Sequence, residues 1–241
     1  MQENFLREKL FERYAKGGTW FARFRAGAYF IFKRYSWQLV IKSTLIIKRC
    51  LDIVISLLMI LLLSPLLLLT ALIIKLEDGG PVIFCQMRVG KKGRRFVMYK
   101  FRSMIVDAEK IKEELTDLNE TQSIIFKIRK DPRLTTVGRI IRKLSIDELP
   151  QLFNILKGDM SLVGPRPPVP SEVSKYKLRD LGRLDVMPGL TCIWQVSGRS
   201  KLNFDRQVDL DLQYIDSQSV WTDIKLLFKT IPAVLLGKGA Y

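Results

Sequence analysis

The chain has 241 residues and a formal net charge of +16, with 40 lysines and arginines against 24 acidic residues. It contains no histidine, which excludes Ser-His-Asp and Cys-His catalysis and histidine-bound zinc. Its cysteines, Cys50, Cys85 and Cys192, lie far apart with no C-x-x-C pair, so we expect neither a zinc knuckle nor a disulfide framework. The excess of cations favours an anionic partner, namely nucleic acid, a lipid surface or a phosphorylated substrate.

The first segment, residues 1–47, is basic and aromatic. Within it, residues 20–35 read WFARFRAGAYFIFKRY, so that rings alternate with arginines and lysines. Amphipathic rings and cations both suit the headgroup zone of a membrane, and we expect this segment to lie at the interface. The alternative is a nucleic-acid-binding segment that uses stacking and charge.

A membrane anchor is expected over residues 48–76. Residues 53–74 read IVISLLMILLLSPLLLLTALII and carry no charge, and about 20 such residues match the apolar core of a bilayer. Basic residues flank both ends, as they do at cytoplasmic ends, which favours a re-entrant helix–break–helix with the break at Ser64 and Pro65. A kinked span and a buried core helix are the alternatives.

The remaining residues, 77–241, are expected to form one compact α+β domain. Periodicity and turn residues predict strands over 82–89 and 95–101, with a turn between them. Helices are expected over 107–122, 149–156 and 204–215. Near the C-terminus an amphipathic helix is indicated by apolar residues at helical spacing, namely Trp221, Ile224, Leu227, Phe228 and Ile231.

Two adjacent carboxylates, Asp147 and Glu148, stand at the expected start of the helix over 149–156. Ser145 and Glu148 fit a capping box, in which each side chain bonds the other residue's backbone N–H. Pro150 suits a first helical turn. This interpretation explains Ser145 and Glu148 by structure alone but gives Asp147 no role.

Several motifs in consistent order resemble those of a known family. They are the Ser-Pro pair in one apolar segment, YKFRSM over 99–104, LSIDELPQLFNILKGDMSLVGPRP over 144–167, PGLTCIWQVSGR over 188–199 and the ending GKGAY. This set, spanning residues 48–241, resembles the monotopic phosphoglycosyl transferases, also called bacterial sugar transferases. The resemblance implies an α+β catalytic domain on a re-entrant helix, at the cytoplasmic face of the bacterial inner membrane.

The implied activity is transfer of a sugar-1-phosphate from a UDP-sugar to undecaprenyl phosphate, with release of UMP. In this family an aspartate forms a covalent phosphosugar intermediate, and that position falls on Asp147, with Glu148 as its partner. The family's substrate- and phosphate-binding cations fall on Lys100, Arg102, Arg142, Arg166 and Arg199. The resemblance also implies Mg²⁺, or Mn²⁺, with Asp147 and Asp223 as ligands and Glu148 in support. One departure is Cys192, where the family often has glycine, and we expect it to alter the local turn.

The resemblance to hexose-type members extends to the long stretch over 107–132, which implies glucose-1-phosphate or galactose-1-phosphate. An N-acetylhexosamine-1-phosphate remains the alternative, and either would start an exopolysaccharide, capsule or O-antigen unit. Two alternatives from other functional classes stay open. One is a membrane-tethered nucleic-acid binder, but the sequence contains none of the usual nucleic-acid-binding motifs. The other is a non-catalytic scaffold, but such a protein would not need both carboxylates. We expect membrane lipids but no nucleic acid as partners, and leave homo-oligomerisation open.

Overall fold

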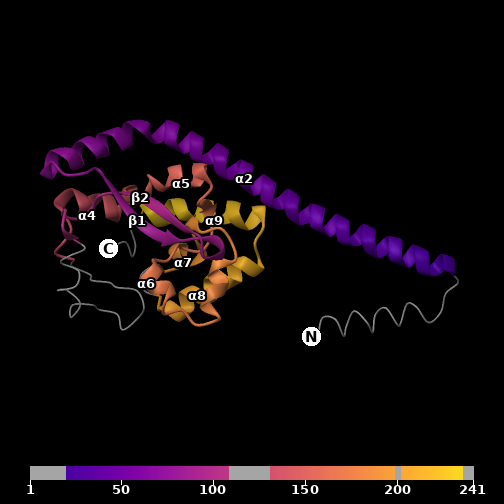
Figure 1. Ribbon diagram of the computed structural model, residues 1–241. Coiled ribbons are helices and arrows are strands. Elements are labelled where there is room, and N and C mark those ends of the chain that lie inside the picture. Colours follow the sequence, from indigo (N-terminus) through magenta and orange to yellow (C-terminus); the bar gives the residue numbers. More distant parts are fainter. Residues whose placement is uncertain (1–19, 109–130, 199–201, 236–241) are drawn as a thin grey trace. The chain divides into compact units, whose positions relative to one another are not determined.

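The computed structural model describes residues 20–108, 131–198 and 202–235 (Figure 1). Most of the expected helix over 107–122, Arg199 and the GKGAY ending lie outside these residues. The chain divides into two compact units, residues 1–48 and 49–241, and each is described by itself. In the first unit, the described residues are helical and expose aromatic side chains, among them Phe24, Tyr29 and Phe32.

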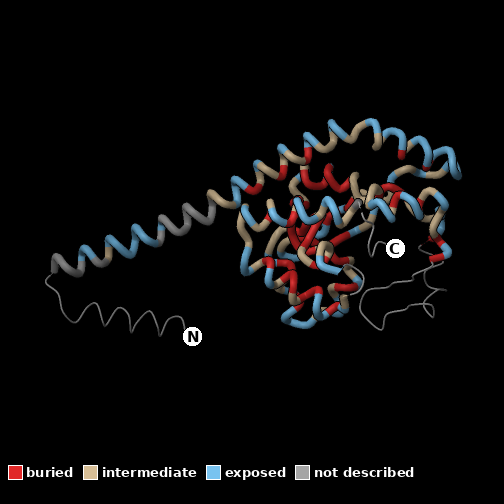
Figure 2. The backbone as a smooth tube through the Cα atoms, turned by 180° about the vertical axis from the view of Figure 1, so that it is seen from behind, coloured by how far each residue is buried: buried red, intermediate tan, exposed pale blue. Residues whose placement is uncertain are grey.

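Helix α2 (Trp20–Asp78) contains the long apolar segment. From Arg49 onward one of its faces is buried against the domain and carries Asp52, Ser56, Thr70 and Ile74. The opposite face is rich in leucines that are largely exposed, and Figure 2 shows these exposed positions recurring along the helix. Residues 43–78 are long and apolar enough to cross a membrane, by length and composition. The exposed leucines therefore form a surface suited to lipid.

We expected a break between two helices at Ser64 and Pro65. That expectation is wrong, because α2 continues through both residues without a gap. The Ser64 hydroxyl donates to the carbonyl of Leu61 at 2.8 Å. Proline removes one backbone donor and crowds the preceding turn, which bends a helix without necessarily ending it. Figure 1 accordingly shows α2 bent in its C-terminal part.

Near Arg49, hydrogen bonds made by two residues of α2 attach this helix to the rest of the domain. The Arg49 guanidinium donates to the carbonyls of Ile155 and Leu156, at 2.6 and 2.9 Å. These carbonyls belong to the last turn of helix α5 (Gln151–Lys157), where a cation is favourable. Asp52 accepts a bond from the backbone of Leu162 at 3.0 Å.

Two small sheets organise the domain. Strands β1 (Ile83–Val89) and β2 (Arg95–Phe101) pair antiparallel around the short helix η1 (Lys91–Gly93), which confirms the predicted hairpin. Strands β3 (Ser161–Val163) and β4 (Gly189–Thr191) pair in parallel and were not predicted. A Cβ atom on Gly189 would lie 2.0 Å from the backbone nitrogen of Gly164, so this close approach requires glycine.

Helices surround these strands, and the helices predicted over 149–156 and 204–215 are confirmed within two residues. The helices not yet given are α4 (Thr136–Lys143), η3 (Ile146–Glu148), α6 (Pro170–Val173), η4 (Asp180–Leu184), α7 (Ile193–Val196), α8 (Phe204–Asp216) and α9 (Val220–Leu235). The main core joins strands, α5, α8 and α9 through residues such as Met98, Leu152, Val163, Tyr214 and Leu226. This core fixes the hairpin relative to α5 and the short η3 before it.

Helix α9 confirms the predicted amphipathic helix near the C-terminus. Leu226 and Asp223 are buried on its inner face. Trp221 and Phe228 are 63% and 70% exposed, so the outer face of the helix is apolar as well. An exposed face with a tryptophan and a phenylalanine suits the interface of a membrane.

Candidate active site

The acidic pair lies on η3, a single 3-10 turn between α4 and α5. Ser145 precedes it with φ 55°, in the left-handed region, and its side chain makes no capping bond. The capping-box prediction is therefore wrong, because the serine serves as a sharp turn rather than as a cap. A non-glycine residue in this conformation carries strain, which often accompanies functional sites. The turn places two carboxylates between two packed helices.

Asp147 is buried, with 7% of its surface exposed. Burial raises the pKa of its carboxyl group to about 6, and the negative charge of Glu148 acts in the same direction. The charges of Lys100 and Arg142 oppose this rise but do not cancel it. In the part of the chain that the structure describes, its carboxylate accepts no hydrogen bond from another side chain. Asp147 is thus desolvated, flanked by cations and not committed to a partner.

Glu148 has a defined partner on the hairpin. Lys100 of β2 donates to Glu148 Oε1 at 2.7 Å, and both side chains are partly exposed. Such a charge-assisted bond fixes the direction of the glutamate side chain. The two neighbouring carboxylates therefore differ: Glu148 is held by a cation, and Asp147 is free to react.

The other cations predicted to bind substrate differ in their surroundings. Arg142, in the last turn of α4, is near enough to influence the pKa of Asp147. Arg166, in the Pro-Arg-Pro loop (residues 165–167), lies 3.9 Å from Glu172 and keeps 31% of its side chain exposed. Arg102 is instead buried and pairs with Asp78 at the end of α2. Arg199 is outside the described residues, so its role stays a prediction.

Asp223 is also buried, on α9. The Tyr214 hydroxyl donates to Asp223 Oδ1 at 2.7 Å, and burial together with this carboxylate raises the pKa of Tyr214. No described contact joins Asp223 to Asp147, and its predicted role as a metal ligand remains untested. The structure therefore brings Lys100, Arg142 and Glu148 around Asp147, and engages Asp223 elsewhere.

The donor set limits how a divalent cation would bind. Within residues 20–108, 131–198 and 202–235, no group of three or more aspartate, glutamate or cysteine side chains is placed to hold a metal. Mg²⁺ commonly binds through one or two carboxylates and completes its shell with substrate phosphates and water. The uncommitted carboxylate of Asp147 fits that manner of binding.

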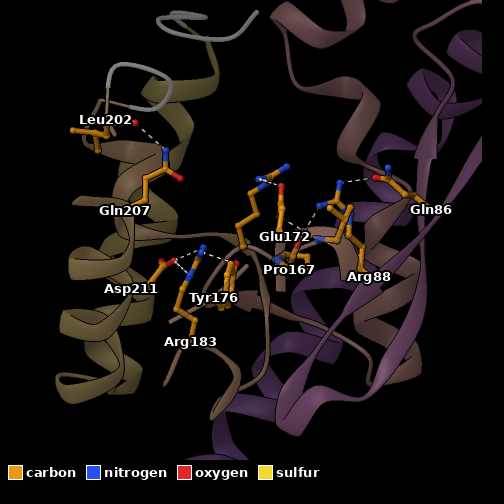
Figure 3. Close-up of polar contacts among 11 residues, drawn as sticks. Gln86, Arg88, Pro167, Glu172, Tyr176, Arg183, Leu202, Gln207 and Asp211 are labelled. Carbon is orange, nitrogen blue, oxygen red and sulfur yellow. Dashed lines mark hydrogen bonds and ion pairs between the residues drawn. The ribbon is translucent and has the colours of Figure 1, made fainter. Parts of the chain in front are cut away.

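A second polar cluster was not predicted from the sequence (Figure 3). Arg183 donates from Nε and Nη2 to Asp211 Oδ2, at 2.8 and 2.7 Å, and both residues are buried. Arg183 also donates to the Tyr176 hydroxyl at 2.9 Å. The partners lie 28 positions apart, and no local pattern in the sequence links them.

Cys192 lies near this cluster and is fully buried, and burial raises the pKa of its thiol. It precedes α7 with φ −149°. That conformation is extended backbone, which any residue adopts. Cysteine therefore meets no backbone restriction at this position, and its effect on the local turn stays a prediction.

Comparison with known proteins agrees with the motifs. The family model described as bacterial sugar transferase matches residues 43–237. Galactosyl transferase CpsE of Streptococcus agalactiae is 49% identical over 86% of this chain and 46% of its own length. The undecaprenyl-phosphate galactose phosphotransferase of Salmonella typhimurium is 44% identical over 83% of this chain and 43% of its own length. The exopolysaccharide production protein ExoY of Rhizobium meliloti is 42% identical over 70% of this chain and 76% of its own length. The chain thus spans less than half of the first two relatives. It belongs to the bacterial sugar transferase family.

Proposed function

We propose that this chain transfers a hexose-1-phosphate from a UDP-hexose to undecaprenyl phosphate at the cytoplasmic face of the membrane, and so starts an exopolysaccharide unit. One observation carries the proposal: Asp147 is a buried carboxylate that accepts no side-chain hydrogen bond within the described residues, beside a Glu148 that Lys100 holds. Two relatives are named as a galactosyl transferase and a galactose phosphotransferase, which makes galactose the first sugar to test. An N-acetylhexosamine is the second.

The reaction has two displacement steps. An Asp147 carboxylate oxygen attacks the β-phosphorus of the donor, the bond to the α-phosphate oxygen breaks, and UMP leaves. A phosphate oxygen of the lipid acceptor then attacks the same phosphorus and releases Asp147, giving a lipid diphosphate sugar. Splitting the transfer this way lets one carboxylate serve two bulky anionic substrates in turn.

The surroundings of Asp147 suit the first step. Removal from water favours reaction of the carboxylate, which is poorly stabilised in its buried ionised form. Lys100 and Arg142 supply positive charge where phosphoryl oxygens would gather, and Arg166 and Arg199 extend that set. Glu148, whose direction Lys100 fixes, would orient the acceptor or exchange a proton with it.

Asp147 would hold Mg²⁺ or Mn²⁺ together with the donor's phosphates, and Asp223 would support this ion directly or through water. Such an ion neutralises charge on the phosphoryl oxygens. Turnover should stop in excess chelator and return with added Mg²⁺. Full turnover in excess chelator would contradict this part of the proposal.

The membrane arrangement we propose is re-entrant. The exposed leucines of α2 and the exposed Trp221 and Phe228 of α9 would face lipid, with both ends of the apolar segment on the cytoplasmic side. Single cysteines before Lys48 and after Lys75, in a chain lacking the native cysteines, would be labelled only from the cytoplasm. Replacing Ser64 and Pro65 by alanine should shift the helix toward a straight span. Periplasmic labelling of the unmutated anchor would contradict the re-entrant path.

The test of the activity is the half-reaction without acceptor. The full chain in nanodiscs, mixed with UDP-galactose, should release UMP and gain the mass of one hexose phosphate in intact-protein mass spectrometry. Asp147→Asn should show neither. The same assay with UDP-glucose and UDP-N-acetylhexosamines ranks the sugars. An adduct that maps to Glu148 would overturn the assignment of the nucleophile.

A further inference from the structure

Arg88 is a buried cation that the reaction above does not use. It lies in β1 with 6% of its surface exposed. Its Nη1 donates to the carbonyl of Pro167 at 2.9 Å, and its Nη2 donates to Gln86 Oε1 at 2.5 Å. Its Nε is buried and has no partner among the residues that the structure describes. All its polar partners there are neutral oxygens, so no described carboxylate neutralises the charge directly.

Two hydrogen bonds within the described residues attach the Pro-Arg-Pro loop and the residue after it to β1, and the first is the bond from Arg88 to Pro167. The second is the backbone of Val89, which donates to the carbonyl of Pro168 at 2.9 Å. Figure 3 shows Arg88 and Gln86 reaching from the hairpin toward Pro167 and Glu172. These bonds hold Pro167 and Pro168, the two residues after Arg166, and so help to fix the direction in which the Arg166 side chain projects.

The charges around Arg88 do not balance. Burial, and then repulsion from Arg166, lower the pKa of Arg88 to about 9, despite the opposing charges of Glu172 and Glu148. Glu172 lies 3.9 Å from Arg166, while Glu148 is engaged by Lys100 and Asp211 by Arg183. Among the carboxylates that the structure describes, Glu172 is therefore the one that these two arginines share. A buried cation without a matching anion is costly, and a bound anion would relieve that cost.

The hairpin connects this cation to the acidic pair. Lys100 lies opposite Phe84 in the register of the two strands. Side chains alternate between the faces of a strand, and cross-strand partners share a face. Phe84, Gln86 and Arg88 therefore lie on the same face as Lys100, which bonds Glu148. One face of the hairpin thus positions both the acidic pair and the Pro-Arg-Pro loop.

We propose that Arg88 is a positioning residue for the donor's diphosphate: it holds the Pro-Arg-Pro loop so that Arg166 faces the phosphates, and the unbalanced charge of the two arginines attracts them. This rests on the proposed function, since it takes a UDP-sugar as the donor. Arg88 acts through the loop and through its charge, so its loss should weaken recognition of phosphate rather than of the nucleoside.

The experiment compares binding of UDP and of uridine to the full chain in nanodiscs. Arg88→Gln keeps a donor for the Pro167 carbonyl but removes the charge, and Arg88→Lys keeps the charge but not the forked geometry. Arg95→Gln is the matched control, because it removes an exposed cation from the same hairpin. We expect UDP affinity to fall at least about tenfold in Arg88→Gln and less in Arg88→Lys. Uridine affinity and the control should stay within about twofold of wild type.

The outcomes separate the inference from the proposed function. Unchanged UDP affinity in Arg88→Gln, or equal losses for UDP and uridine, would overturn the role of Arg88. If Arg88→Gln fails to fold, the affinities of Arg88→Lys for UDP and for uridine are compared in the same way and decide the question. Wild-type chain that binds UDP in an Arg88-dependent way but releases no UMP from any UDP-sugar would support the anion site and contradict the proposed reaction.

Discussion

Asp147 and Asp211 are both buried, and burial raises the pKa of each carboxyl group to about 6. Their surroundings differ. Asp211, on α8, accepts two bonds from Arg183, whose own pKa rises because of this carboxylate although burial opposes it. Asp147, on η3, has cations nearby but accepts no side-chain hydrogen bond within the described residues.

The comparison shows that a raised pKa reports burial and does not by itself identify a reactive group. The partner of the carboxylate decides its role. A carboxylate bound by a buried arginine is committed to the fold, because breaking the pair leaves a charge in a dry environment. A carboxylate that is buried without such a partner is destabilising where it stands, which is typical of a reactive group.

The largest effect should come from removing the uncommitted carboxylate. Asp147→Asn should lower turnover by at least about a thousandfold, because an amide is a poor nucleophile. Steady-state UMP release with acceptor measures this. Asp211→Asn, assayed at a temperature where it is folded, should retain the covalent adduct. A variant at Asp147 that keeps more than about a tenth of the turnover would contradict the assignment.

The second-largest effect is a loss of stability, which we expect when Asp211 is replaced. Asp211→Asn leaves the Arg183 charge buried without its partner, so the free energy of unfolding should drop by about 3–5 kcal/mol. Thermal unfolding followed by circular dichroism would record the loss. Asp209→Asn on the same helix is a suitable control, because its pairing with Arg179 is largely exposed. An Asp211→Asn chain as stable as the control would mean that the pair is not what holds η4 against α8.

Part of this contrast could be predicted from the sequence. The motif around Asp147 and Glu148 identified the acidic pair, and periodicity predicted the hairpin and two helices to within two residues. These features are local, since they depend on neighbouring residues and helical or strand repeats. The Arg183–Asp211 pair, the Arg88–Pro167 contact and the parallel pairing of β3 with β4 join residues far apart in the chain.

Two local predictions failed for a different reason. Ser145 fits a capping pattern, yet the chain needs a sharp left-handed turn there to pass from α4 into η3. Ser64 and Pro65 fit a break, yet the helix accommodates the lost backbone bond by bending, with the serine hydroxyl on the Leu61 carbonyl. In both places a residue type fits more than one backbone conformation, and the local pattern does not decide between them.

The third effect is a pH dependence of the first half-reaction. Asp147 attacks as the ionised form, and its pKa is raised to about 6. The rate of UMP release without acceptor should therefore be constant above about pH 7 and fall about tenfold per unit below pH 6. Leaving out the acceptor removes the titration of its phosphate, and circular dichroism checks that the Asp211 region stays folded. A rate that is unchanged at pH 5 would rule out Asp147 with this pKa as the nucleophile.

The smallest effect is a gain in stability, and its sign distinguishes the two aspartates most sharply. Because the pKa of Asp147 is raised from 3.8 to about 6 on folding, the folded chain binds more protons than the unfolded chain between these values. Stability therefore falls as the pH rises through this window, and at neutral pH the ionised carboxylate costs about 1–3 kcal/mol. Asp147→Asn removes that cost, so its melting temperature at pH 7.5 should exceed that of wild type by a few degrees. The difference should shrink toward pH 4.5, where the wild-type carboxyl group is protonated as well. Asp211→Asn should be less stable than wild type at pH 7.5, so matching losses in both variants there would show that Asp147, too, serves the fold.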